Sequence, residues 1–180
     1  APIAAGKSEL LYEGKDVAIL AVGSMVQVAE DVRIRLMEAG ITPTVVNVRF
    51  VKPVDCSLII SLAASHKLVV TMEENVLRGG FGEQVDALLA RENSVSCENS
   101  AISECSGARS AGSDIGSGGN VQTFDEYSMD GRGGNKIART LNFGIPDVYV
   151  EHGYVDFLKA TLGLDAASVT EKILEEFEKL

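Results

Sequence analysis

The sequence has no tryptophan, two histidines and three cysteines, and each scarcity argues against a class of protein. The cysteines Cys56, Cys97 and Cys105 are too few and too scattered for a disulfide framework. Cys97 and Cys105 could pair or share a metal, but the chain has no CxxC motif and no histidine near them. We therefore expect reduced thiols in a cytosol-like compartment. So few histidines also make a Ser–His–Asp hydrolase a poor candidate.

Basic residues are scarce as well. The chain has 16 Lys and Arg against 26 Asp and Glu, which gives a net charge of −10. This balance argues against a nucleic-acid surface, which needs clustered Lys and Arg, and against anionic membranes. No apolar run approaches the roughly 20 residues needed to span a bilayer. The first residues, APIAAGKSELL, lack the pattern of a signal peptide. We expect no nucleic acid and no membrane as partner.

The 46% of hydrophobic residues suffices for the core of one domain of ordinary size. Short β-branched runs alternate with amphipathic helical patterns, and the connections between them are short. Such an order predicts a parallel sheet with right-handed crossovers. The expected strands are Val17–Val22, Thr44–Val48 and Leu68–Met72, and the helices begin after Ser24, after Asp55 and at Phe81, the last running to about Ala90.

The pattern fails from about residue 91 to 135, where Ser, Gly and Asn dominate. Few bulky apolar residues are present to offset the entropy of ordering, so we expect a flexible surface insertion. Its glycine strings GSGGN and DGRGGN do not match the phosphate-loop pattern.

Order resumes beyond the insertion, and a short lead-in precedes the first unit. The whole predicts an α/β fold of three layers, in which helices cover both faces of a mostly parallel sheet of about five strands. The remaining expected elements are an edge strand at Leu10–Tyr12, a fourth strand at Ile137–Phe143, an extended piece at Val148–Val150, a short helix at Tyr154–Leu162 and a last helix capped by Asp165.

The stretch KLVVTMEENVLRGGFG joins a buried strand to a glycine-led helix. Glu73 and Glu74 fall where that strand is expected to end, at the edge where open α/β sheets meet ligands or other domains. Adjacent residues on a strand point to opposite faces, so the two cannot act as an acid–base pair on one substrate. One could reach a cleft while the other bonds a neighbouring backbone or an arginine. We expect Arg49 and Arg78 to share this edge, in a mixed-sign cluster that suits docking as well as ligand binding.

Other candidate sites are weak. The turn AVGSMVQ has one glycine, so the dinucleotide fingerprint GxGxxG is missing and NAD binding is improbable. Ser24 lacks the G-x-S-x-G context of a nucleophile and is expected to cap a helix. We expect His66 at a helix end or on the surface. His152 lies between Glu151 and a glycine, and both a role at an interface or cleft and a local structural role are open.

Four strings carry a resemblance to a known family: GKDVAILAVGSM, TVVNVRFVKPVD, LVVTMEENVLRGGFG and NFGIPDVYVEHG, in that order. Together they closely resemble the carboxy-terminal domain of 1-deoxy-D-xylulose-5-phosphate synthases, within the broader family of transketolase C-terminal domains. The likeness covers nearly all of the chain except about residues 91–135.

The resemblance implies a thiamine-diphosphate-dependent transferase that joins pyruvate and glyceraldehyde 3-phosphate, with loss of carbon dioxide, for isoprenoid, thiamine and pyridoxal synthesis. In this family the cofactor and Mg²⁺ ligands belong mainly to the preceding pyrimidine-binding and diphosphate-binding domains. This chain has no GDG…N metal motif. We assign it no catalytic, cofactor-binding or metal-binding residue, and expect it to be inactive and free of cofactor alone.

The resemblance implies instead a structural role at domain contacts and in a homodimer, in the bacterial cytoplasm or a plastid-like organelle. Arg49, Glu73, Glu74 and His152 lie on the matching strings and are the interface candidates. One alternative is the C-terminal domain of a 2-oxo acid dehydrogenase β subunit, which shares the fold. Another is a free-standing module that binds a small anion or a protein.

Overall fold

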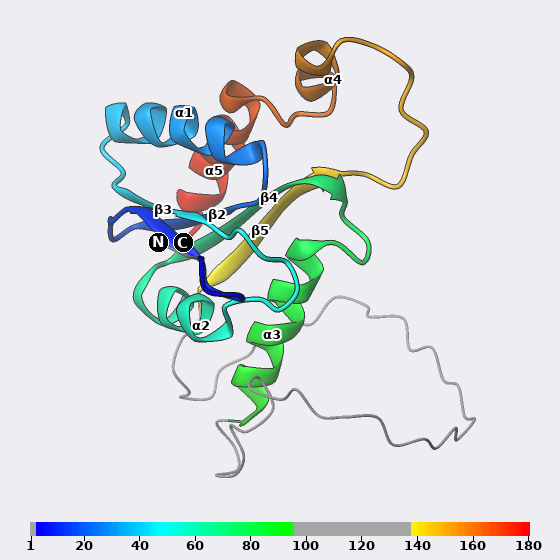
Figure 1. Cartoon of the computed structure of the whole chain (residues 1–180). Helices are drawn as coiled ribbons and strands as arrows, with labels where there is room; N and C mark the ends of the chain where they lie inside the picture. Colours follow the sequence, from blue (N-terminus) through cyan, green and yellow to red (C-terminus); the bar gives the residue numbers. More distant parts are fainter. Residues whose placement is uncertain (1–2, 96–137) are drawn as a thin grey trace, which may run out of the picture.

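The computed structural model describes residues 3–95 and 138–180, and its centre is a five-stranded sheet (Figure 1). The strand order is β1-β3-β2-β4-β5, and every neighbouring pair is parallel except β1 with β3. This arrangement confirms the predicted α/β class and the edge strand. The strands are β1 Glu9–Tyr12, β2 Val17–Ala21, β3 Pro43–Asn47, β4 Leu68–Val76 and β5 Arg139–Ile145.

Helices cover both faces of the sheet (Figure 1). On one face α1 packs with α5, and on the other α2 packs with α3. Within the described ranges, no helix combines the length and apolar character needed to cross a bilayer. The helices are α1 Met25–Glu38, α2 Cys56–Ser65, α3 Phe81–Val95, α4 Val155–Thr161 and α5 Ala166–Phe177.

The central strands supply two separate cores because their side chains alternate between the faces. On β2, Val17 and Ile19 pack beneath α1 and α5, while Ala18 and Leu20 pack beneath α2 and α3. All five residues of β2 are buried. A strand covered on both faces cannot alternate between apolar and polar residues, which explains the continuous run VAILA.

Several boundaries differ from those expected. β4 continues past Met72 to Val76, because its pairing with β5 resumes at Val76 and Ile145 after an irregularity. The fourth strand begins and ends two residues later than expected. Residues 148–150 form no strand. α3 extends to Val95, so the expected insertion could begin no earlier than residue 96. From there the insertion lies outside the described residues, as do Cys97 and Cys105.

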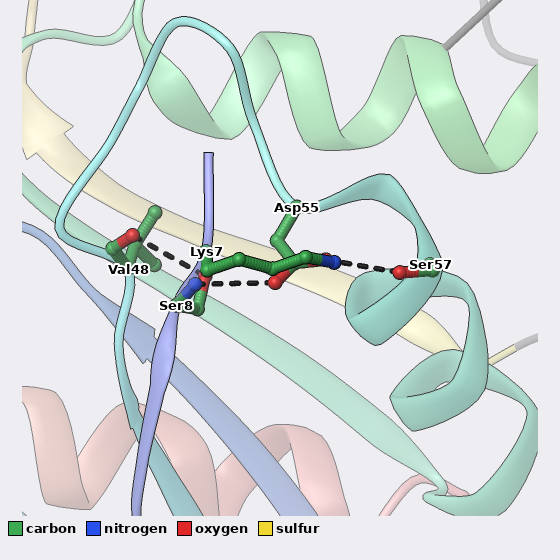
Figure 2. A network of polar contacts seen from close by, with 5 residues as sticks. All are labelled: Lys7, Ser8, Val48, Asp55 and Ser57. Atoms are coloured by element: carbon green, nitrogen blue, oxygen red, sulfur yellow. Dashed lines mark hydrogen bonds and ion pairs between the residues drawn. The ribbon is translucent and has the colours of Figure 1, made fainter. Parts of the chain in front are cut away.

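Asp55 precedes α2 as expected, but its carboxylate does not cap the helix backbone. It accepts the backbone N–H of Ser8 at 3.1 Å, the hydroxyl of Ser57 at 3.0 Å and the ammonium of Lys7 at 3.3 Å (Figure 2). Ser8 in turn donates its hydroxyl to the carbonyl of Val48. The buried Asp55 thus fastens the segment before β1 to the start of α2. Burial raises the pKa of Asp55, but these bonds outweigh it and leave the pKa below its ordinary value.

The last two helices are held very differently. Asp165 caps α5 as predicted, accepting the backbone N–H groups of Ala167 and Ser168. Val169 and Ile173 are fully buried on the inner side of this helix. By contrast, α4 buries none of its residues.

Candidate functional site

A cleft of about 250 Å³ opens at the carboxyl ends of the central strands. It is lined by the turn after β2 (residues 22–24), by Val51, by residues 73–75 of β4, and by the turn that enters α3 (residues 79–81). Open α/β sheets bind ligands at this edge, so the cleft is the natural candidate site. What its polar groups already bond decides whether it can take a ligand.

Glu73 is buried, with 3% of its surface exposed, and its carboxylate is used within the chain. One oxygen accepts the backbone N–H of Phe81 at 2.8 Å and the other accepts that of Gly82 at 2.9 Å. These N–H groups belong to the first turn of α3, where no intrahelical acceptor exists. The carboxylate also lies at the positive end of the helix dipole. The neighbouring-backbone option predicted for this pair of carboxylates is therefore the one that Glu73 takes.

The glycines before α3 allow this close approach. A Cβ atom on Gly80 would lie 2.6 Å from both carboxylate oxygens of Glu73 and 2.4 Å from the carbonyl oxygen of Val76. Gly79 has a φ of +71°, in the left-handed region that other residues resist. The glycines of RGGFG therefore make room for the Glu73 carboxylate at the start of α3, a position where a phosphate loop would bind its ligand.

Glu74 points to the other side and joins two helices. Its carboxylate lies 2.8 Å from the ammonium of Lys159 on α4. The bond from Lys159, followed by a bond from the hydroxyl of Ser24, holds the pKa of Glu74 below its ordinary value. Ser24 precedes α1 as predicted, but its side chain makes no capping bond to the helix. The Ser24 hydroxyl bonds the carboxylate of Glu74 instead.

Neither Arg49 nor Arg78 is among the residues that line the cleft, although Arg78 directly precedes the lining residue Gly79. That the two arginines share this edge of the sheet with the carboxylates stays a prediction. Arg49 forms an ion pair with Glu9 of β1 and has a φ of +60°. Arg78 lies 3.7 Å from Asp147, and both side chains are largely exposed. The antiparallel pairing that puts Glu9 opposite Asn47 draws Arg49 toward the edge of the sheet.

The two histidines occupy opposite environments. His152 is exposed. His66 lies at the C-terminal end of α2, which confirms the helix-end alternative, and it is buried, so the surface alternative is wrong. Its Nδ1 lies 3.0 Å from the carbonyl oxygen of Leu62, and its Nε2 lies 2.8 Å from the hydroxyl of Thr44, which also accepts the N–H of Gly14. Since a carbonyl only accepts, Nδ1 carries the proton and Nε2 accepts from Thr44. His66 is a structural histidine that links α2 to β3.

The cleft therefore offers little free chemistry. Its buried carboxylate is bonded to backbone, and its exposed one to a lysine and a hydroxyl. Among the described residues, no group of three or more His, Cys, Asp or Glu could hold a metal ion. The carboxylates that line the cleft connect strands to helices: Glu73 accepts from the backbone of α3, and Glu74 bonds Lys159 of α4 and the hydroxyl of Ser24.

Comparison with known proteins agrees with this architecture. Residues 6–112 match the model of the family described as "Transketolase, C-terminal domain". The chain is 36% identical over 169 residues to 1-deoxy-D-xylulose-5-phosphate synthase from Dehalococcoides mccartyi strain CBDB1, covering 94% of this chain and 20% of that enzyme. The corresponding synthase of Lachnoclostridium phytofermentans is 37% identical over 171 residues, covering 95% and 21%.

A third such synthase, from Trichodesmium erythraeum, is 37% identical over 176 residues and covers 98% of this chain and 21% of its own length. A solved structure of a split-gene transketolase, an inactive β4 tetramer, shares the fold with a TM-score of 0.70 at 24% identity, over 99% of this chain and 44% of its own. The chain thus spans about a fifth of the length of the synthases it matches. It belongs to the transketolase C-terminal domain family, in the form found in 1-deoxy-D-xylulose-5-phosphate synthases.

Proposed function

We propose that this chain is the C-terminal domain of a thiamine-diphosphate-dependent 1-deoxy-D-xylulose-5-phosphate synthase and acts in it as a structural lobe. That enzyme joins pyruvate to glyceraldehyde 3-phosphate and releases carbon dioxide. The observation that carries the proposal is the identity of 36–37% over at least 94% of the chain to synthases from three bacteria. Likeness to solved structures supports the fold alone, whereas the identity to these relatives extends over nearly the whole chain.

In this proposal, thiamine diphosphate and Mg²⁺ are bound by the other domains of the full enzyme and not by this chain. Thiamine diphosphate needs donors for its diphosphate, and a helix N-terminus is a common source of them. At α3 that position is filled by the carboxylate of Glu73. The start of α3 therefore offers no free donors to the diphosphate, and no step of the cofactor's chemistry is assigned to the described residues. The same contact counts against a free-standing small-anion module.

The proposed partners are the pyrimidine-binding and diphosphate-binding domains of the same enzyme, in a homodimer, located in the bacterial cytoplasm or a plastid-like organelle. Arg49, Glu74 and His152 remain interface candidates, since each has exposed surface. Glu73 is buried and both of its oxygens bond α3, so we expect it to hold the turn in place and not to contact a partner directly.

Two measurements test the proposal. The complete reading frame should encode thiamine-diphosphate-binding domains ahead of this one, and its product should convert pyruvate and glyceraldehyde 3-phosphate to deoxyxylulose 5-phosphate. The purified 180-residue chain should show no turnover, and no heat of binding on titration with thiamine diphosphate and Mg²⁺. Turnover by the 180-residue chain would overturn the structural role, and a reading frame without those domains would overturn the assignment to a synthase.

A further inference from the structure

The segment from Val148 to Phe157 exposes large apolar side chains in succession. Figure 1 shows this segment leaving the end of β5 as a long loop that projects from the sheet and returns to α4. Scattered single apolar residues are normal on a protein surface, but a run of them within one segment marks an interaction site. The members of this 148–157 surface and their exposed fractions are Val148 61%, Tyr149 92%, Tyr154 90%, Val155 63% and Phe157 67%.

The helix that ends this surface cannot be stable through its own bonds. α4 has seven residues, and isolated helices of that length do not persist in water without packing. Yet none of its residues is buried in this chain. Its polar attachment is the ion pair between Lys159 and Glu74. That pair fixes the helix at the cleft while Val155 and Phe157 remain in solvent.

The negative charge around the 148–157 surface argues against acidic partners. Asp147, Glu151 and Asp156 lie in or directly beside the 148–157 surface, in a chain of net charge −10. A second copy docking through the same surface would bring these carboxylates together, which is unfavourable. Anionic lipid is disfavoured for the same reason. An apolar surface with a basic rim is complementary.

We propose that the 148–157 surface docks onto the remainder of the same synthase polypeptide, on an apolar surface rimmed by Lys and Arg. This inference rests on the proposed function. The chain spans only 20–21% of the synthases it matches, so about four fifths of such an enzyme is available to cover it. Glu74, through Lys159, is then a positioning residue that presents α4 to that surface.

The test compares one double variant in two contexts. Tyr149→Ser with Phe157→Ser removes two exposed rings and should leave the melting temperature of the 180-residue chain unchanged. In the full-length enzyme the same variant should lower the melting temperature and speed amide exchange across residues 148–157, on the order of tenfold or more. The matched control is Ile34→Ser with Met37→Ser on α1, two side chains outside the 148–157 surface that are 52% and 49% exposed. The control should be neutral in both contexts.

Three results would overturn the inference. The first is equal amide exchange of residues 148–157 in the full-length enzyme and in the 180-residue chain. The second is a double variant that is as neutral in the enzyme as the control. The third is a 180-residue chain that sediments as a dimer and becomes a monomer in the double variant, which would make a second copy the occupant. If the full-length enzyme turns over its substrates in these cases, the proposed function stands and only the docking fails.

Discussion

The backbone N–H of Phe81 donates to Oε2 of Glu73 at 2.8 Å, eight residues back along the chain and out of contact with solvent. This bond and its neighbour from Gly82 close the turn between β4 and α3. At the carboxyl edge of the sheet, the anion bound at the start of α3 is thus a side chain of the protein itself, and its bonds should contribute to the stability of the domain.

Glu73→Gln should destabilise the domain. The substitution keeps the size of the side chain but replaces one accepting oxygen by an NH₂ group that faces a backbone donor. Hydrogen bonds to charged groups contribute about 1.5–3 kcal/mol, and we expect a loss in that range. Urea unfolding of the 180-residue chain measures it. Glu74→Gln is the control, because its ion pair is partly exposed and should contribute less than about 1 kcal/mol. Equal losses from the two variants would contradict the assignment.

Gly80→Ala should be costly for a steric reason. The added methyl group would meet the carbonyl oxygen of Val76 and the carboxylate of Glu73, both well inside contact distance. Overpacking of this kind costs about 1–3 kcal/mol. Gly40→Asn is the comparison, because Gly40 has a φ of +82° with open space around it, and asparagine tolerates that conformation after a helix. Thermal unfolding should show a clear shift for position 80 and a small one for position 40.

Acid should weaken the network at Asp55. The pKa of this carboxyl is lower in the folded chain than its ordinary value of 3.8. Its contribution is therefore complete above that value and is lost as the pH falls through the lower, folded pKa. Asp55→Asn should destabilise the chain at pH 7 by about 1–3 kcal/mol and reduce the further loss on acidification. Urea midpoints at several pH values between about 3 and 7 give both quantities.

Lys7→Gln provides the control for that experiment. The Lys7 side chain is 61% exposed, so its ion pair with Asp55 should contribute little, whereas the N–H of Ser8 and the hydroxyl of Ser57 remain. If Lys7→Gln were as damaging as Asp55→Asn, the exposed ion pair would carry the network, contrary to the prediction.

Thr44→Val should also be destabilising, although it preserves shape. The hydroxyl accepts from Gly14 and donates to His66, and its loss leaves the buried Nε2 of His66 and the half-buried N–H of Gly14 without this partner. An unsatisfied buried group costs about 1–3 kcal/mol. Thr42→Val removes an exposed hydroxyl that bonds Asp16 and should cost less. A neutral Thr44→Val would show that the His66 link carries no stability.

The sequence predicted what depends on local pattern. The buried run of β2 and the capping of α5 by Asp165 both follow from neighbours within a few residues. Features set by distant pairing were missed. β4 runs on to Val76 because β5 offers a partner there. His66 is buried at the end of α2, where it contacts Thr44 of β3, 22 residues earlier in the sequence. No local signal reports either contact.

The candidate site divides in the same way. The string EENVLRGGFG predicted a special turn, and the adjacency of Glu73 and Glu74 predicted that their side chains would separate. The placement of Arg49 could not be derived, because it depends on the register of an antiparallel edge strand that brings Glu9 within reach. The exposure of the 148–157 surface was also missed, since apolar residues in a short helix look the same whether they face a core or a missing neighbour.

In many α/β proteins the free N–H groups at the start of a helix bind a phosphate. At the start of α3 the carboxylate of Glu73 already accepts these N–H groups. Glu73→Ala would remove a CH2–COO− group and leave a gap the size of acetate beside the N–H groups of Phe81 and Gly82. Dissolved acetate should then bind in that gap and raise the melting temperature of the variant, while leaving that of the unsubstituted chain unchanged.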